Sequence, residues 1–346
     1  MGFNKGEWSE LYTFLYLFEE PSLVIVDENL KVIEENLFKI IEIVLGKVKY
    51  QILEDKVIKT GENKEYKIEC IAKNNALLLH KILSHKKSKG SFEIKALDTL
   101  IDDLFDGKKP KGSSKVKGDL EANVLDKRCS KTVNLKYNIK SNLGSKATLL
   151  NASRHTNFIY EIKNIDDEVM NKSNSIKSRK KLLEKCAFLV EKGAVFDFVK
   201  TESNVFENNL KLIDSKLDEI LAQMLLLSYK KNEKDIQKLL SFIIEDTTSE
   251  IFYKKKMGDF ANAVTFGMRA SEEWDGTNEV NGGIIIVTKK GEVYLLDLIY
   301  FKDMVDRYLI DNIKLDSPSS KRYNMFKIYK EGEKYYFKLN LQVRFK

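Results

Sequence analysis

Apolar residues recur at every third or fourth position near the start of the chain. Trp8, Leu11, Leu15 and Phe18 keep this spacing, which predicts an amphipathic helix over residues 4–19. Similar patterns predict helices near 75–85, 92–105 and 301–312, through most of 203–258, and in an apolar stretch around 37–45.

Apolar and polar residues alternate over residues 119–126 and again over 133–140, which predicts two strands. Gly, Ser and Pro between 107 and 117 predict a loop before them. Strands are also expected within 22–71, at 284–287 and 293–299, and in a hairpin from 324 to 344. The mixture predicts an α/β (α+β) fold, with a mixed central sheet flanked by helices, a helical insertion and a strand-rich C-terminal region.

Composition narrows the class of protein. The chain has 346 residues, 43% hydrophobic, with 3 Pro, which fits about two folded domains rather than a disordered chain. No apolar run approaches the ~18 residues that a membrane helix needs, and the first residues lack the apolar core of a signal peptide. Three scattered cysteines support neither a disulfide framework nor a zinc cluster. A soluble, cytoplasmic protein with no membrane partner is expected.

Positive charge is concentrated in one segment. Residues 105–146 contain eleven basic and four acidic side chains, an excess equal to the net charge of +7 for the whole chain. Such a concentration favours a polyanionic partner such as nucleic acid, although a solvated surface explains many charge runs of this kind.

The two strands in this segment place polar residues on a common face. If residues 127–132 close a hairpin, Asp119 faces Lys140 and Glu121 faces Asn138. Two carboxylates, an amide and an ammonium group would then converge. Phosphodiester cleavage needs a divalent metal held by carboxylate oxygens and a cation that stabilises charge, so Asp119 and Glu121 are candidate ligands and Lys140 is the candidate cation. The structural alternative is a cross-strand ion pair on an exposed face, worth at most about 1 kcal/mol.

These residues resemble the PD-(D/E)XK nuclease core, and more specifically the HpaII family of type II restriction endonucleases. Three blocks carry the resemblance: residues 3–12 (FNKGEWSELY), residues 139–158 (IKSNLGS, then TLLNAS and TNF), and residues 338–345 (KLNLQVRF). The blocks span the chain from residue 3 almost to its end.

The resemblance implies Mg²⁺-dependent cleavage of double-stranded DNA, with Asp119 as metal ligand and Lys140 as the motif lysine. It suggests a short palindromic site such as CCGG, and a palindrome favours either a homodimer or a monomer that nicks each strand in turn. A cognate DNA methyltransferase acting on the same site is expected, without binding to this chain.

One position departs from the motif. Asn138 stands where Asp or Glu is usual, and a neutral amide is a weaker ligand for a hard cation. Glu121 is one candidate for the second carboxylate. Glu7 and Glu10 are others, because first-helix carboxylates assist metal binding in many nucleases of this type. Ordinary helix N-terminal charge also explains Glu7 and Glu10. Asn138 keeps open a second function, a sequence-specific DNA-binding protein without catalysis.

The segment that follows Lys140 is polar and small, which suits contacts to DNA phosphates and base edges. Arg154 is its best candidate for reading guanine, with a phosphate contact as the alternative. The candidate DNA-binding residues are Ser141, Asn142, Gly144, Ser145, Thr148, Asn151, Ser153, Arg154, Thr156 and Asn157.

Three consecutive regions are expected from these assignments. Residues 1–165 would form the catalytic nuclease core with its N-terminal helix, and residues 166–260 a mainly helical region. Residues 261–346 would form a strand-rich region packed on the core for DNA recognition.

Overall fold

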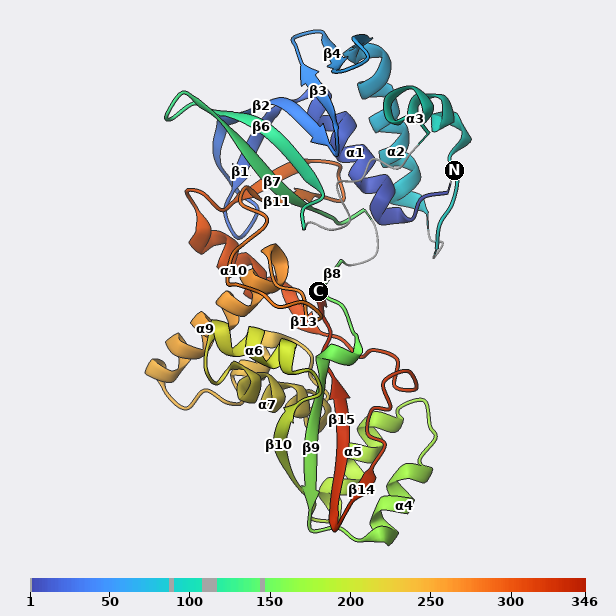
Figure 1. Ribbon diagram of the computed structural model, residues 1–346, viewed down its shortest axis with the longest axis vertical. Coiled ribbons are helices and arrows are strands. Elements are labelled where there is room, and N and C mark those ends of the chain that lie inside the picture. Colours follow the sequence, from blue (N-terminus) through green and yellow to red (C-terminus); the bar gives the residue numbers. More distant parts are fainter. Residues whose placement is uncertain (1, 87–89, 108–116, 144–146) are drawn as a thin grey trace. The chain divides into compact units, whose positions relative to one another are not determined.

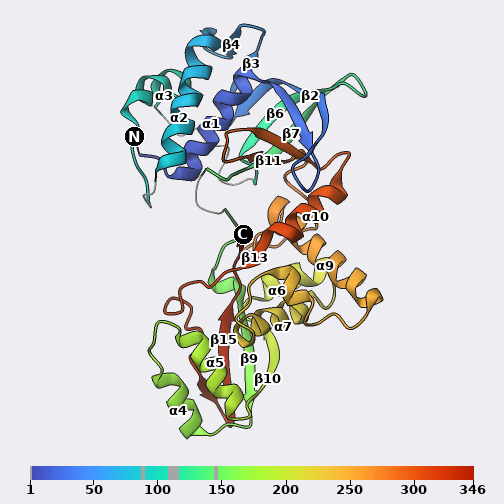
Figure 2. The same ribbon diagram turned by 180° about the vertical axis from the view of Figure 1, so that it is seen from behind.

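The computed structural model describes residues 2–86, 90–107, 117–143 and 147–346 (Figures 1 and 2). Contacts divide the chain into two compact units. Unit 1 comprises Met1–Ala147 and Asn278–Tyr308, and unit 2 comprises Thr148–Thr277 and Leu309–Lys346. This division differs from three consecutive regions, because strands from the last quarter of the chain complete the sheet of unit 1.

Unit 1 is built on a nine-stranded mixed sheet in the order β1-β12-β11-β7-β6-β2-β3-β4-β5. Strand β1 also pairs with β2, so six of the strands close a ring. The strands are β1 (Ser22–Val26), β2 (Val32–Leu45), β3 (Val48–Ile52), β4 (Lys56–Lys59), β5 (Lys64–Lys67), β6 (Leu120–Asp126), β7 (Lys131–Ser141), β11 (Gly283–Val287) and β12 (Val293–Asp297). The predicted α/β class is confirmed.

The helix expected around residues 37–45 is wrong, because these residues belong to strand β2. Ile40, Ile43 and Val44 are β-branched and favour a pleated strand. The pairing of β2 with β6 shifts register between Ile40 and Glu42, so the buried positions are not evenly spaced by two. In the sequence, this irregular spacing of apolar residues resembles the three-to-four-residue spacing of a helix.

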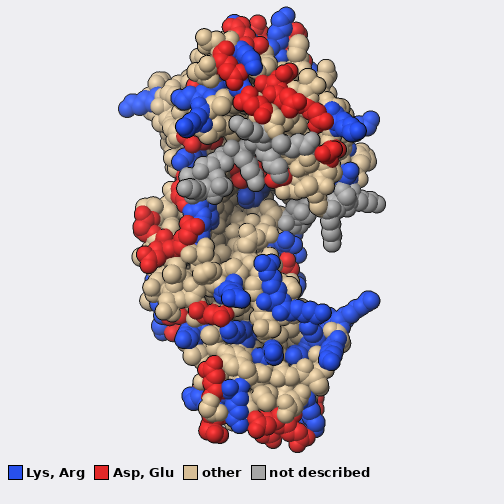
Figure 3. Space-filling model, turned by 45° about the vertical axis from the view of Figure 1, so that its right-hand side comes forward, with Lys and Arg blue, Asp and Glu red and all other residues tan. Residues whose placement is uncertain are grey.

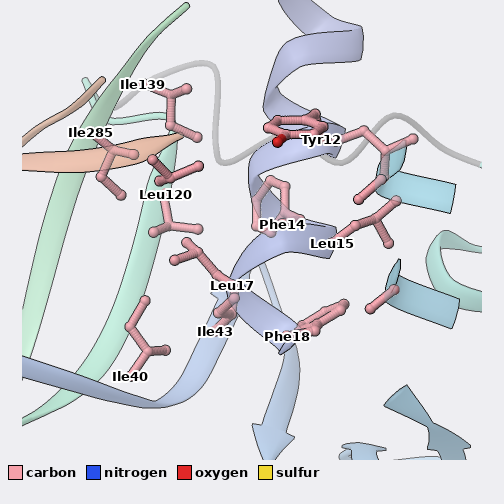
Figure 4. Packing of buried hydrophobic residues seen from close by; sticks show 14 of the residues in the cluster. Tyr12, Phe14, Leu15, Leu17, Phe18, Ile40, Ile43, Leu120, Ile139 and Ile285 are labelled. Atoms are coloured by element: carbon pink, nitrogen blue, oxygen red, sulfur yellow. The ribbon is translucent and has the colours of Figure 1, made fainter. Parts of the chain in front are cut away.

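Helix α1 (Lys5–Glu19) begins where the sequence predicted. Asn4 accepts a hydrogen bond from the Glu7 backbone, and the Glu7 side chain accepts one from the Asn4 backbone, which together form a capping box. Figure 4 shows Phe14 and Leu17 of α1 among apolar side chains of the sheet such as Leu120 and Ile285. Burial of this apolar face holds α1 on the sheet.

Shorter elements complete unit 1. The helices predicted near 75–85 and 92–105 are confirmed, although the second begins as a short 3₁₀ turn. They are α2 (Asn74–His85), preceded by a π-helical turn (Glu69–Lys73), and α3 (Asp98–Phe105), preceded by the 3₁₀ turn (Lys95–Leu97). The expected loop at 107–117 falls mostly outside the described residues. Helix α10 (Lys302–Asn312) crosses from unit 1 into unit 2, close to the predicted 301–312.

Unit 2 contains two small sheets and most of the helices. A four-stranded sheet has the order β10-β9-β15-β14, and a three-stranded sheet has the order β13-β16-β8. The strands are β8 (Thr148–Leu150), β9 (Asn157–Lys163), β10 (Val195–Thr201), β13 (Ile313–Leu315), β14 (Tyr329–Glu331), β15 (Lys334–Asn340) and β16 (Val343–Phe345). The predicted C-terminal hairpin is confirmed for β14 and β15, which join at the expected turn.

The helices of unit 2 include the predicted helical stretch 203–258. They are α4 (Asp167–Ser175), α5 (Lys181–Glu191), α6 (Asn204–Ile213), α7 (Leu217–Lys230), α8 (Ile236–Leu240) and α9 (Thr247–Phe266). None of the helices in the described ranges is both long enough and apolar enough to span a membrane.

Candidate active site

Asp119 and Lys140 lie together at the paired strands β6 and β7. The Asp119 backbone N–H donates to the Tyr137 carbonyl at 2.8 Å, which fixes the residue at the start of β6. Its Oδ2 accepts a hydrogen bond from the Ile139 N–H at 2.8 Å and lies 3.5 Å from the Lys140 Nζ. Both contacts are made by Oδ2, so the carboxylate is held through one of its two oxygens.

The strand register differs from the predicted one by two residues. Asp126 pairs with Lys131 rather than with residue 133, because the turn is closed by 127–130, with Ser130 in the left-handed region at φ 54°. Glu121 therefore faces Lys136 and not Asn138. A shift of two residues keeps every side chain on its predicted face, so Asp119 still lies on the face that carries Asn138 and Lys140.

The two faces of this hairpin have different environments. Leu120, Tyr137 and Ile139 point into the core beneath α1, as Figure 4 shows for Leu120 and Ile139. On the other face, β11 places Ile284 beside Asn138 and Ile286 beside Lys140.

Burial on that face differs from residue to residue. Ile284, Ile286 and Asn138 are buried, which lowers the local dielectric. The side chains of Lys140 and Asp119 keep 19% and 30% of their exposed area, so both remain accessible from solvent.

The carboxylates of α1 are placed differently from Asp119. The Glu7 side chain is buried and completes the capping box of α1, with Oε2 accepting from the Asn4 N–H at 2.8 Å. Glu10 is half-buried one turn later. Both residues belong to α1, which packs on the core face of the sheet. The pairing of β6 with β7 joins Asp119 to Lys140, and this pairing does not place Glu7 or Glu10 beside those two residues.

The donors around Asp119 fit a magnesium ion better than a softer metal. No group of three or more His, Cys, Asp or Glu side chains suited to a metal occurs in the described ranges. Mg²⁺ is commonly held by one or two carboxylates, with waters and substrate phosphates completing the shell. The Asp119 carboxylate, Glu121 two residues further on the same face, and the Asn138 amide oxygen supply oxygen ligands of that kind.

The predicted DNA-binding segment is divided between the two units. In unit 1, Ser141 ends β7 and Asn142 follows it in a turn, where the Ser141 Oγ accepts from the Leu143 N–H. Gly144 and Ser145 lie outside the described residues. The remaining candidates belong to unit 2, and Asn151 and Arg154 are the exposed ones.

Several of the candidates in unit 2 are tied into hydrogen bonds. The Thr148 hydroxyl accepts from Arg344 at 3.1 Å. Ser153 and Thr156 form a capping box around a 3₁₀ turn, Arg154–Thr156, and Thr156 and Asn157 are buried. These bonds shape the backbone that presents Arg154.

No role was predicted from the sequence for Asn340 or Glu202, which support this turn together with Asn157. Asn340 is fully buried and donates to the Ser153 carbonyl and to the Asn157 Oδ1, each at 2.6 Å. Asn157 in turn donates to Glu202 at 2.6 Å. The only signal for Asn340 was its place in the last of the three blocks that carry the family resemblance.

Two comparisons with known proteins point to the same family. The model of the HpaII restriction endonuclease family matches residues 4–345. The chain is also 34% identical, over 357 aligned positions, to a protein of Haemophilus parainfluenzae described as "Type II restriction enzyme HpaII". That match covers 99% of this chain and 98% of the relative. No solved structure matches.

Proposed function

Because the chain belongs to the HpaII restriction endonuclease family and is thus a site-specific deoxyribonuclease, we propose that it hydrolyses both strands of duplex DNA at a short palindromic site such as CCGG, with Mg²⁺. The cleavage centre would be formed by Asp119 and Lys140. The observation that carries this assignment is their contact across β6 and β7, with Asp119 held by the Ile139 N–H.

The residues have separate roles in this proposal. Asp119 would hold the metal, helped by Glu121 or a carboxylate of α1, and Asn138 would offer its amide oxygen. The bound ion would polarise the phosphate and make a coordinated water more acidic. Lys140, which lies 3.5 Å from Asp119, would place an ammonium group where negative charge develops on the phosphate oxygens.

The backbone contributes to the same chemistry. The hydrogen bond from Ile139 fixes the carboxylate of Asp119 before DNA binds, so little reorganisation is needed during the reaction. The buried side chains of Ile284 and Ile286 border the polar group and exclude water from one side of it. A palindromic site would favour a two-fold homodimer, in which each copy cuts one strand.

The test is incubation of the protein with an unmethylated plasmid of known sequence, in Mg²⁺ and in EDTA. Discrete fragments in Mg²⁺ alone are expected, and sequencing their ends gives the recognition site and the cut position. The same plasmid methylated at CCGG is the matched control and should stay intact. Binding without cutting in Mg²⁺ would contradict the proposed catalysis, and cutting at another sequence would contradict CCGG.

A further inference from the structure

Unit 2 contains a polar pocket of about 430 Å³ beside the sheet of β9, β10, β14 and β15. Two arginines and two lysines line it together with two glutamates, two asparagines and two tyrosines. The lining residues are Arg154, Asn157, Glu202, Arg322, Tyr323, Asn324, Lys327, Tyr329, Glu331 and Lys338. Lys and Arg side chains gather on the face of unit 2 that Figure 3 shows.

Positive side chains outnumber negative ones in the lining of the pocket. Lys338 is paired with Glu202 at 2.8 Å. Arg154, Arg322 and Lys327, by contrast, form no salt bridge with any residue of the described ranges, although many lysines of this chain do. All three are exposed, and the nearest ring contact of Arg322 is with Tyr323. Of the charged side chains that line the pocket, four are cationic and two, Glu202 and Glu331, are anionic, and this excess of positive charge attracts an anion.

One wall of the pocket is held rigidly. Arg154 lies on the capped 3₁₀ turn, and the buried amide of Asn340 ties that turn to Asn157. Asn157 donates to Glu202, whose backbone N–H donates back to the Asn157 carbonyl at 2.8 Å. The turn is therefore fixed before any ligand binds, which reduces the entropic cost of binding.

Another part of the lining comes from a loop with an unusual backbone. Asn324 and Phe326 adopt left-handed conformations at φ 49° and 51°, which is costly for a bulky residue such as Phe326. The loop is held in place because the Phe326 N–H donates to the Lys338 carbonyl and the buried Lys185 donates to the Phe326 carbonyl. Strain maintained by specific bonds in this way is typical of a functional site.

We propose that this pocket binds a backbone phosphate of the substrate DNA through Arg154, Arg322 and Lys327. The inference rests on the proposed function in one respect, since it takes duplex DNA as the substrate. A phosphate diester carries a negative charge, and the three cations have no salt-bridge partner of that charge among the described residues. Guanidinium groups bind phosphate oxygens with two parallel hydrogen bonds. Exposure of the three side chains allows a polymer, and not only a small ion, to reach them.

The experiment compares two triple variants of equal charge change. The first replaces the pocket cations (Arg154→Ala, Arg322→Ala, Lys327→Ala). The second replaces three exposed lysines of unit 2 that line no described pocket and form no described salt bridge (Lys192→Ala, Lys200→Ala, Lys216→Ala). Fluorescence anisotropy with a labelled duplex containing CCGG, in EDTA and over about 50 to 200 mM salt, gives Kd and its salt dependence.

The pocket variant is expected to bind about tenfold more weakly or worse, and the slope of log K against log salt should fall by about 0.9 for each phosphate that the variant no longer neutralises. The control variant should keep a slope close to that of the wild type. Equal losses of affinity in the two variants would show a diffuse field rather than a site, and would overturn the proposal. Unchanged binding by the pocket variant would also overturn it.

Two further measurements separate this inference from the proposed function. Wild-type cleavage in Mg²⁺ is recorded on the same preparation. If the wild type binds and cuts while the pocket variant binds normally, only the pocket assignment fails. If the wild type neither binds nor cuts, both fail. A conservative variant (Arg154→Lys, Arg322→Lys) should retain most of the salt slope, and its loss of the slope would contradict a role based on charge.

Discussion

The Asn340 amide donates a 2.6 Å hydrogen bond to Asn157 although 183 residues separate them in the chain. The same amide donates to the Ser153 carbonyl, and both Asn340 and Asn157 are buried. The bonds join the second and third blocks of the family resemblance into one structural feature of unit 2. The two blocks therefore meet at one turn of this chain, and the residue that the turn exposes is Arg154.

Loss of this amide should destabilise unit 2. Asn340→Ala leaves the buried Asn157 Oδ1 and the partly buried Ser153 carbonyl without this donor, which costs about 1–3 kcal/mol of the free energy of unfolding. Urea denaturation measures the change. Asn208→Ala, at an exposed position of α6, is the control and should change stability by less than about 0.5 kcal/mol. Equal effects of the two substitutions would contradict the role of the Asn340 bonds.

Glu202 should make the folding stability of the protein depend on pH in the acidic range. Burial acts to raise its pKa, but hydrogen bonds from Lys338 and Asn157 and the charge of Arg154 outweigh it, and the pKa is lower than the ordinary 4.5. A lowered pKa in the folded state gives stability that is present above pH 4.5 and is lost as the pH falls through the folded-state value.

The measurement is the midpoint of thermal unfolding between neutral pH and about pH 3, compared with Glu202→Gln. The difference between the wild type and the variant should shrink below pH 4.5. A difference that stays constant over this range would show that the carboxylate is not linked to folding.

Gly282 should tolerate no side chain. A Cβ there would lie 2.4 to 2.8 Å from ring carbons of Tyr137, which is fully buried and cannot move aside. Gly282→Ala is expected to cost about 1–3 kcal/mol through overpacking and to slow cleavage, because Gly282 also binds the Lys136 carbonyl in the strand of Lys140. Gly2→Ala, whose Cβ would meet only ordinary contacts, is the control for stability. Wild-type stability of Gly282→Ala would refute the close packing.

The register of β6 and β7 can be tested by cross-linking. Cysteines at Glu121 and Lys136 should oxidise readily to a disulfide, because directly opposed residues have Cα atoms about 4.5–5.5 Å apart. Cysteines at Glu121 and Asn138 are diagonal neighbours about 7–8 Å apart and should cross-link poorly. Peptide mass spectrometry distinguishes the pairs from the three natural cysteines. Preferential linkage of the second pair would restore the register inferred from sequence.

The sequence was most informative where local patterns determine structure. The apolar period of α1 and the alternation in β6 and β7 predicted elements that the structure contains. The faces of the hairpin were also correct, because a shift of two residues leaves them unchanged. The position of the turn was wrong, since nothing in 127–132 distinguishes a loop of four residues from one of six.

Other features depend on contacts that no local pattern records. The bulge in β2 gave the apolar residues of a strand the apparent period of a helix. The central strands β11 and β12 join the sheet of unit 1 from far along the chain. The pocket of unit 2 combines Arg154 with Arg322 and Lys327, which lie more than a hundred residues further on. Such a cluster becomes visible only when the chain is folded.

The central claim is that Asp119 and Lys140 together form the cleavage centre. The most direct measurement is the single-turnover rate of plasmid cleavage in Mg²⁺ by the wild type, Asp119→Asn and Lys140→Ala, with the Kd for the same DNA measured in EDTA. Both variants should cut about 10²–10³-fold more slowly while binding within a few-fold of the wild type. Cleavage by either variant at the wild-type rate would place the chemistry elsewhere in the protein.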